Sequence, residues 1–237
     1  MPGDVLICVD FDDTLVSNQE HFARALEHLA RLLAAEAGAG PAKVAEVFSA
    51  VDREHDHRGR HRNRFLVTVF ATYCAVTGRS GVPLEMVPDL AAISAIPYDA
   101  LPEPVAGAPQ ALTALRKAGT VYLVTAGDPV TQPGRVQRSG LAPLFDGVHV
   151  VPEKTPEVYR ELRAGYDLAF MIGNAARTDI LPALAAEFAA IHVQAPTWDL
   201  DDLPLPSHVP SLPGFPEAAR AVLGMIHPGR VATRKDR

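Results

Sequence analysis

Short apolar runs alternate with segments of helical periodicity along much of the chain, and this alternation constrains the fold more than any other feature. An early run is VLICV at 5–9, and the later ones are TVYLVTAG, GVHVV, LAFMIGN and AAIHVQ, all between residues 120 and 194. The segments between the later runs, such as PQALTALRKAG and TPEVYRELRAG, have the length of crossover helices. The pattern predicts an α/β fold with a doubly wound (Rossmann-like) parallel sheet.

The pattern changes between the first apolar run and the second. Residues 19–93 contain long helical stretches, including NQEHFARALEHLARLLAAEAG and NRFLVTVFATYCAVTG, without alternating strand signals. We interpret them as an inserted all-helical cap domain. The predicted division is 1–16 and 98–237 for the α/β core and 17–97 for the cap, with the proline-rich AIPYDALPEPVAGAP as the return linker.

Composition limits the classes of partner. The formal net charge is -6 and the isoelectric point is near 5.8, so there is no global electrostatic reason to bind nucleic acid or an anionic membrane. No apolar stretch of about 18 residues runs unbroken. We therefore expect a cytoplasmic protein whose partner is a small soluble ligand, and the sequence leaves the oligomeric state open.

Three carboxylates follow the first apolar run directly, at Asp10, Asp12 and Asp13. Carboxylates gathered at a strand end repel one another and lose hydration, a cost that a cation or charged ligand normally offsets. The alternative is an ordinary acidic turn. In doubly wound sheets, ligands bind beyond the carboxyl ends of the strands, where the residues Thr125 and Gly173 are also expected.

Four separated segments, in order, resemble the motifs of the haloacid dehalogenase-like (HAD) hydrolase superfamily. They are DFDDTL, LVTAGD, the lysine of PEKTPEVY, and IGNAARTDI. Each falls at the end of a predicted strand or at a helix start, and the helical insertion lies where that family places a cap. The resemblance covers the core, about two thirds of the chain.

The resemblance implies a magnesium-dependent phosphatase acting on a small phosphorylated metabolite. Asp10 is then the nucleophile that forms an aspartyl-phosphate, and Asp12 is the acid and base, its pKa raised by acidic neighbours. Thr125 is expected to hydrogen-bond a phosphoryl oxygen and Lys154 to screen the charge of the phosphate and Asp10. Asp12 favours phosphate over halide, because displacement of halide at carbon needs no acid two residues after the nucleophile.

The same resemblance predicts a Mg²⁺ site made by Asp10, the backbone carbonyl of Asp12, Asn174 and Asp179. Asn174 departs from the usual aspartate of the fourth motif, and its amide oxygen is a ligand without charge. Two alternatives therefore stay open: a phosphotransferase or mutase with the same fold, or a regulatory protein with a catalytically silent phosphate site.

The stretch DREHDHRGRHRNRF, at 52–65, is rich in arginine. One interpretation is a solvated helix end and loop, the usual fate of a charge run. The other is a cationic lid in which Arg60, Arg62 or Arg64 contacts an anionic substrate.

Overall fold

The structure is a computed structural model that describes residues 4–58, 62–195 and 203–227 of the chain. The chain divides into two compact units. The first consists of residues 1–17, 102–126 and 136–237, and the second of residues 18–101 and 127–135. The sequence predicts a cap of residues 17–97; the second unit consists of 18–101 together with 127–135.

The first unit contains a six-stranded sheet in the order β3-β2-β1-β4-β5-β6, with every neighbouring pair parallel. Its strands are β1 (Val5–Val9), β2 (Thr120–Ala126), β3 (Gly147–Val151), β4 (Leu168–Gly173), β5 (Ala189–Val193) and β6 (Ser211–Leu212). All five residues of β1 are buried, because a central parallel strand is covered on both faces. The predicted α/β fold with a doubly wound parallel sheet is confirmed.

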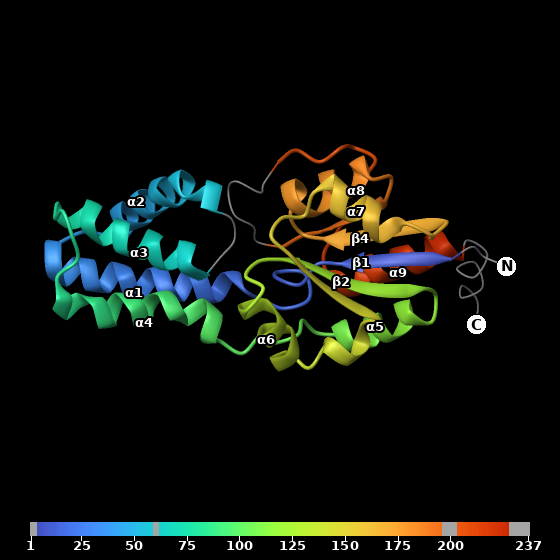
Figure 1. The fold of residues 1–237 in the computed structure, drawn as a ribbon, viewed down its shortest axis with the longest axis horizontal. Coiled ribbons are helices and arrows are strands. Elements are labelled where there is room, and N and C mark those ends of the chain that lie inside the picture. The colour runs from blue at the N-terminus through green and yellow to red at the C-terminus, as the bar shows by residue number, and fades with distance from the viewer. Residues whose placement is uncertain (1–3, 59–61, 196–202, 228–237) are drawn as a thin grey trace, which may run out of the picture. The chain divides into compact units, whose positions relative to one another are not determined.

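Helices cover both faces of this sheet. On one face the hydrophobic core includes residues of α5 (Ala108–Arg116) and α9 (Phe215–Ile226). On the other face it includes residues of α7 (Pro156–Arg163) and α8 (Leu181–Ala185), and Figure 1 shows α7 and α8 side by side next to β4. The strands therefore end at an edge that the two helical layers leave for the loops.

The predicted strands agree with β1–β5 to within about two residues at their ends. The sequence also predicts extended chain after Gln194 followed by one short helix. Extended chain does precede α9, but Ser211–Leu212 adds a sixth strand that pairs with His192 and Val193. A two-residue strand is too short to leave a periodic signal in the sequence.

The second unit is helical in the part that the structure describes. Its long helices are α1 (Gln19–Ala37), α2 (Pro41–Glu54), α3 (Arg62–Thr77) and α4 (Val87–Asp99), and the start of α6 (Thr131–Arg138) groups with them. Aromatic rings join three of the long helices. The Phe22 and Phe65 ring centroids lie 5.0 Å apart, and those of Phe22 and Tyr98 lie 6.0 Å apart, both edge to face.

Helix α4 corrects one prediction. The sequence analysis assigns residues from 95 onward to a proline-rich linker, but α4 continues through Pro97 to Asp99. Pro97 is buried in the last turn of the helix. A proline there removes one backbone hydrogen bond, and burial of its ring against the unit offsets that cost. The linker therefore begins later than predicted.

The two linkers between the core strands and the helical segment run together. Val105 donates its backbone N–H to the carbonyl of Leu15 at 2.8 Å, and Val16 forms an isolated antiparallel bridge with Pro104. Both ends of the insertion thus leave the first unit at one place. Among the described helices, none is long and apolar enough to cross a membrane.

Candidate active site

Asp10 lies one residue beyond β1 and is buried. Its backbone N–H donates to the carbonyl of Ile172 in β4 at 2.9 Å, which extends the strand pairing to the site. The chain then turns sharply, with Leu15 N–H donating to the carbonyl of Phe11 at 2.9 Å and Asp13 in the left-handed region at φ 58°. This turn is the bend after Phe11 that would bring Asp12 back toward Asp10.

Lys154 joins two of the predicted acidic residues. Its Nζ donates to Oδ1 of Asp10, and to Oδ1 of Asp179 at 2.6 Å. The lysine is buried and immediately precedes Thr155, whose side chain accepts from the backbone N–H of Val158 and caps α7. The start of α7 therefore holds the ammonium group at the ends of β1 and β4.

Asp179 reaches the site through a single π-helical turn, η4 (Ala176–Ile180), a feature that often marks functional sites. Its Oδ2 accepts from the backbone N–H of Ala175 at 2.9 Å. Gly173 is required for this approach, because a Cβ atom there would lie 2.5 Å from Oδ2 of Asp179. The glycine of the fourth motif therefore makes room for the carboxylate that follows it.

Thr14 contributes a contact that the sequence analysis does not assign to the site. Its Oγ1 lies 3.0 Å from Oδ2 of Asp10, to which it donates, and 3.3 Å from Oδ1 of Asn174. The threonine belongs to the first motif, DFDDTL, and its place four residues after Asp10 is the signal that could have identified it. One hydroxyl thus brings the nucleophile candidate and Asn174 to a common point.

The electrostatics of the site follow from its burial. Loss of hydration raises the pKa of Asp10 to about 7; the negative charges of Asp179 and Asp12 act in the same direction, and Lys154 opposes them. Burial by itself lowers the pKa of Lys154, but the carboxylates of Asp10 and Asp179 outweigh burial and raise it. The ammonium therefore stays charged, but Lys154 alone leaves Asp10 only partly ionised near neutral pH, so a further cation would be needed to keep it fully ionised.

The oxygen atoms at this site fit Mg²⁺. Oδ2 of Asp10 and Oδ1 of Asn174 both face the hydroxyl of Thr14, and carboxylate, amide and carbonyl oxygens are the ligands that Mg²⁺ takes, usually together with water. No group of three or more His, Cys, Asp or Glu side chains in the described chain is arranged to hold a metal. The predicted Mg²⁺ ligands differ from such a group, because two of them are the side-chain amide oxygen of Asn174 and the backbone carbonyl oxygen of Asp12.

Thr125 and Asp128, at the end of β2 and just after it, have different surroundings. Thr125 is buried in β2, in register with Val150 of β3. Asp128 accepts from the backbone N–H of Val130 at 2.7 Å and of Thr131 at 3.2 Å. Asp128 therefore caps the turn that begins α6, and the phosphate contact of Thr125 stays a prediction.

The arginine-rich stretch lies in the helical unit. Arg64 pairs with Asp52 at 2.7 Å and with Asp56 at 3.3 Å, and only 11% of its side chain is exposed. Arg62 pairs with Asp99 at 3.2 Å. Arg60 lies outside the described residues. Substrate binding by Arg62 or Arg64 stays a prediction, and it would require these ion pairs to open or be shared.

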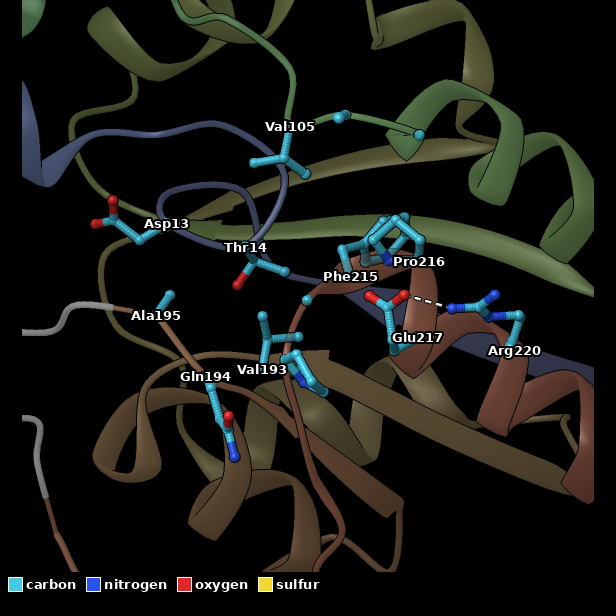
Figure 2. A pocket seen from close by; sticks show the side chains of 14 residues that line it. Asp13, Thr14, Val105, Val193, Gln194, Ala195, Phe215, Pro216, Glu217 and Arg220 are labelled. Atoms are coloured by element: carbon cyan, nitrogen blue, oxygen red, sulfur yellow. Dashed lines mark hydrogen bonds and ion pairs between the residues drawn. The ribbon is translucent and has the colours of Figure 1, made fainter.

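A pocket of about 600 Å³ lies beside the turn that follows Asp10 (Figure 2). Thr14 lines it and is also part of the site described above. The Glu217–Arg220 ion pair forms one wall. The other lining residues are Asp13, Val105, Ala106, Gly107, Val193, Gln194, Ala195, Pro213, Gly214, Phe215 and Pro216. The pocket therefore opens next to the turn after Asp10 rather than around Lys154.

Comparison with solved structures gives the family. A haloacid dehalogenase-like family hydrolase from Xanthomonas campestris is 25% identical, with a TM-score of 0.76 over 94% of each chain. The chain belongs to the HAD superfamily. No protein-family model and no curated protein matches the sequence.

HAD structures with different activities share this fold. A predicted phosphoglycolate phosphatase from Haemophilus somnus is 15% identical with a TM-score of 0.64, over 94% of this chain and 99% of that one. The L-2-haloacid dehalogenase from Xanthobacter autotrophicus is 17% identical with a TM-score of 0.58, over 93% and 98%. At these identities the likeness concerns the fold, so the reaction has to be argued from the site.

Proposed function

We propose that this HAD protein is a magnesium-dependent phosphatase that hydrolyses a small phosphorylated metabolite through an aspartyl-phosphate at Asp10. The observation that carries the proposal is the placement of Lys154 Nζ between the carboxylates of Asp10 and Asp179. A phosphoryl group approaching Asp10 needs positive charge close to the nucleophile, and a buried ammonium supplies it in surroundings where charge interactions are strong.

Each residue has a defined role in this reaction. Asp10 attacks phosphorus, and Asp12 donates a proton to the leaving oxygen. Asp12 then removes a proton from the water that hydrolyses the aspartyl-phosphate. Lys154 balances negative charge on the phosphoryl oxygens and Asp10, while the hydroxyl of Thr125 donates to one of these oxygens. Thr14 orients Oδ2 of Asp10 through the hydrogen bond described above.

Mg²⁺, held by Asp10, Asn174, Asp179 and the carbonyl of Asp12, would neutralise charge on the nucleophile and the phosphate. This requirement agrees with the raised pKa of Asp10, because a nucleophilic carboxylate has to be ionised near neutral pH. The acid Asp12 favours phosphate monoester hydrolysis over dehalogenation, in which no leaving oxygen takes a proton.

The proposed reaction predicts phosphate release that requires Mg²⁺. The purified protein is incubated with sugar phosphates, nucleotides and short phosphocarboxylates, each with Mg²⁺ or with EDTA, and with 2-chloropropionate as a halide control. We expect time-dependent phosphate release from at least one ester, loss of this activity in EDTA, and no chloride release. Chloride release would identify a dehalogenase. Phosphate transfer to a sugar acceptor without net release would favour the phosphotransferase, and complete inactivity would favour the silent site.

The proposed metal site predicts opposite effects at its two sides. Asn174→Asp adds a negative charge beside the ion and keeps an oxygen to accept from Thr14, so the Mg²⁺ concentration for half-maximal activity should fall about tenfold. Asp179→Asn removes a charge and should raise it by at least a similar factor. Turnover need not increase in Asn174→Asp, because the added charge also repels phosphate. A magnesium titration of the parent and both variants measures this, and identical half-saturating concentrations would exclude these residues as ligands.

A further inference from the structure

His192 lies in β5, between β4 and β6, and contacts the residue that directly follows β4, Asn174. Its Nε2 lies 2.9 Å from the backbone oxygen of Asn174, and its Nδ1 lies 2.8 Å from Oγ of Ser211 in β6. The strand registers fix this arrangement, because His192 is opposite Gly173 on one side and Ser211 on the other. A polar side chain in an otherwise apolar strand thus reaches the fourth motif.

The chemistry of these partners defines the tautomer of His192. A carbonyl oxygen can only accept, so Nε2 has to carry a proton and donate to Asn174. Nδ1 of the neutral ring is then an acceptor, and the hydroxyl of Ser211 donates to it. Oγ of Ser211 in turn accepts from Nε2 of Gln194 at 3.3 Å; Gln194 lines the pocket in Figure 2. The hydrogen bonds therefore run in one direction, from Gln194 to Asn174.

The peptide unit between Asn174 and Ala175 is held from both sides. Its carbonyl accepts from His192, and its N–H donates to Oδ2 of Asp179 at 2.9 Å. Hydrogen bonds at the two ends of one peptide unit polarise each other, so the bond from His192 strengthens the bond to Asp179. The same peptide plane fixes the start of the Asn174 side chain, whose Oδ1 meets Thr14.

We propose that His192 is a positioning residue of the active site. It sets the plane of the 174–175 peptide, and through that plane it orients Asp179 toward Lys154 and Asn174 toward Asp10. The inference rests on the proposed function for its consequence, since the residues that it orients are the proposed metal ligands. Groups that orient metal ligands typically change metal affinity by about 10- to 100-fold when they are lost.

Two substitutions separate the hydrogen bond from the packing of the ring. His192→Gln keeps an N–H donor near the position of Nε2, whereas His192→Phe keeps a planar ring and removes both nitrogens. In metal-free protein, we expect the Ala175 amide to exchange with deuterium at least about tenfold faster in His192→Phe, and at nearly the parent rate in His192→Gln. By calorimetry, His192→Phe should bind Mg²⁺ about tenfold more weakly, and His192→Gln within about threefold of the parent.

His149→Phe is the matched control. His149 is also a partly buried strand histidine, in β3, and its ring centroid lies 4.7 Å from that of Tyr122, with the two rings tilted by 55°. Its replacement should change neither the Ala175 exchange rate nor the affinity for Mg²⁺. Ser211→Ala is a second test if His192→Phe fails to fold. It removes the hydroxyl that donates to Nδ1 and helps hold the ring against the Asn174 carbonyl, so it should speed Ala175 exchange several-fold.

The outcomes distinguish this inference from the proposed function. If the parent binds no Mg²⁺, the proposed metal site is wrong, but faster Ala175 exchange in His192→Phe still supports the positioning role. Unchanged Ala175 exchange in both His192→Phe and Ser211→Ala would overturn that role. The role would also be overturned if a folded His192→Gln variant exchanged its Ala175 amide as fast as His192→Phe does. That result would show that the N–H donor at position 192 is not the group that protects the Ala175 amide.

Discussion

Asp10→Asn should abolish phosphate release, lowering turnover by roughly four orders of magnitude or more, while the fold stays intact. The amide keeps the shape of the carboxylate and an oxygen to accept from Lys154, but it cannot form an aspartyl-phosphate. Rapid acid quenching after mixing with ³²P-labelled substrate should trap label on the parent protein and none on the variant. Circular dichroism of both proteins checks the fold.

Asp13→Asn is the control for this experiment. It makes the same chemical change three residues away in the same turn, and asparagine tolerates the left-handed backbone found there. We expect that variant to retain parent-like turnover and label. Near-normal turnover in Asp10→Asn would refute the nucleophile assignment, and equal loss in Asp13→Asn would show that the turn as a whole, rather than one carboxylate, is being disturbed.

Lys154→Met should destabilise the metal-free protein by about 3–5 kcal/mol at pH 8, the typical result when one partner of a buried ion pair is removed. The lysine donates to two carboxylates, and Asp10, Lys154 and Asp179 are all at most 6% exposed. Methionine fills a similar volume but leaves both carboxylates without their shared cation. Urea denaturation in EDTA, followed by circular dichroism, measures the free energy of unfolding.

The loss should depend on pH in a defined direction. The pKa of Asp10 is raised in the folded protein, to about 7, and Lys154 is the group that holds it down. Below that pH a protonated Asp10 needs no cation, so the difference between Lys154→Met and the parent should shrink as the pH falls from 8 to 6. Lys117→Met, at an exposed lysine, should change stability by less than about 0.5 kcal/mol at either pH. A pH-independent difference, or one below about 1 kcal/mol at pH 8, would contradict this account of Lys154.

The strands of the core were predictable because each is a short apolar run with a clear end. The convergence of Asp10 and Lys154 was also predictable in outline, since carboxyl ends of parallel strands meet at one edge. The C-terminal end of helix α4 was not predictable, because a proline such as Pro97 usually indicates the end of a helix. In the structure Pro97 is instead a buried residue of the last helical turn. Local signals favour a linker there, and packing overrides them.

Contacts that depend on how neighbouring strands are aligned could not be predicted from the sequence. His192 meets the Asn174 carbonyl only because β5 is aligned with β4 so that it faces Gly173, and no spacing in the chain encodes that alignment. Asp179 returns to the site through a π-helical turn, which adds a residue to the ordinary helical count. The motif predicted which residues belong together, whereas the hydrogen bonds that orient them required the fold.

The paired linkers at Leu15 and Val105 have a consequence for how the chain folds. Strand β1 pairs with β2, which begins only at Thr120. Bringing two such distant segments together has an entropic cost that grows with the logarithm of the length of chain between them. The helices between them make contacts that are local in sequence and form quickly. Once these helices have formed, the two linkers that leave the insertion can pair with each other. Strands β1 and β2 then meet as if a short connection joined them. The insertion therefore adds many residues to the chain while adding little to the entropic barrier for assembling the sheet.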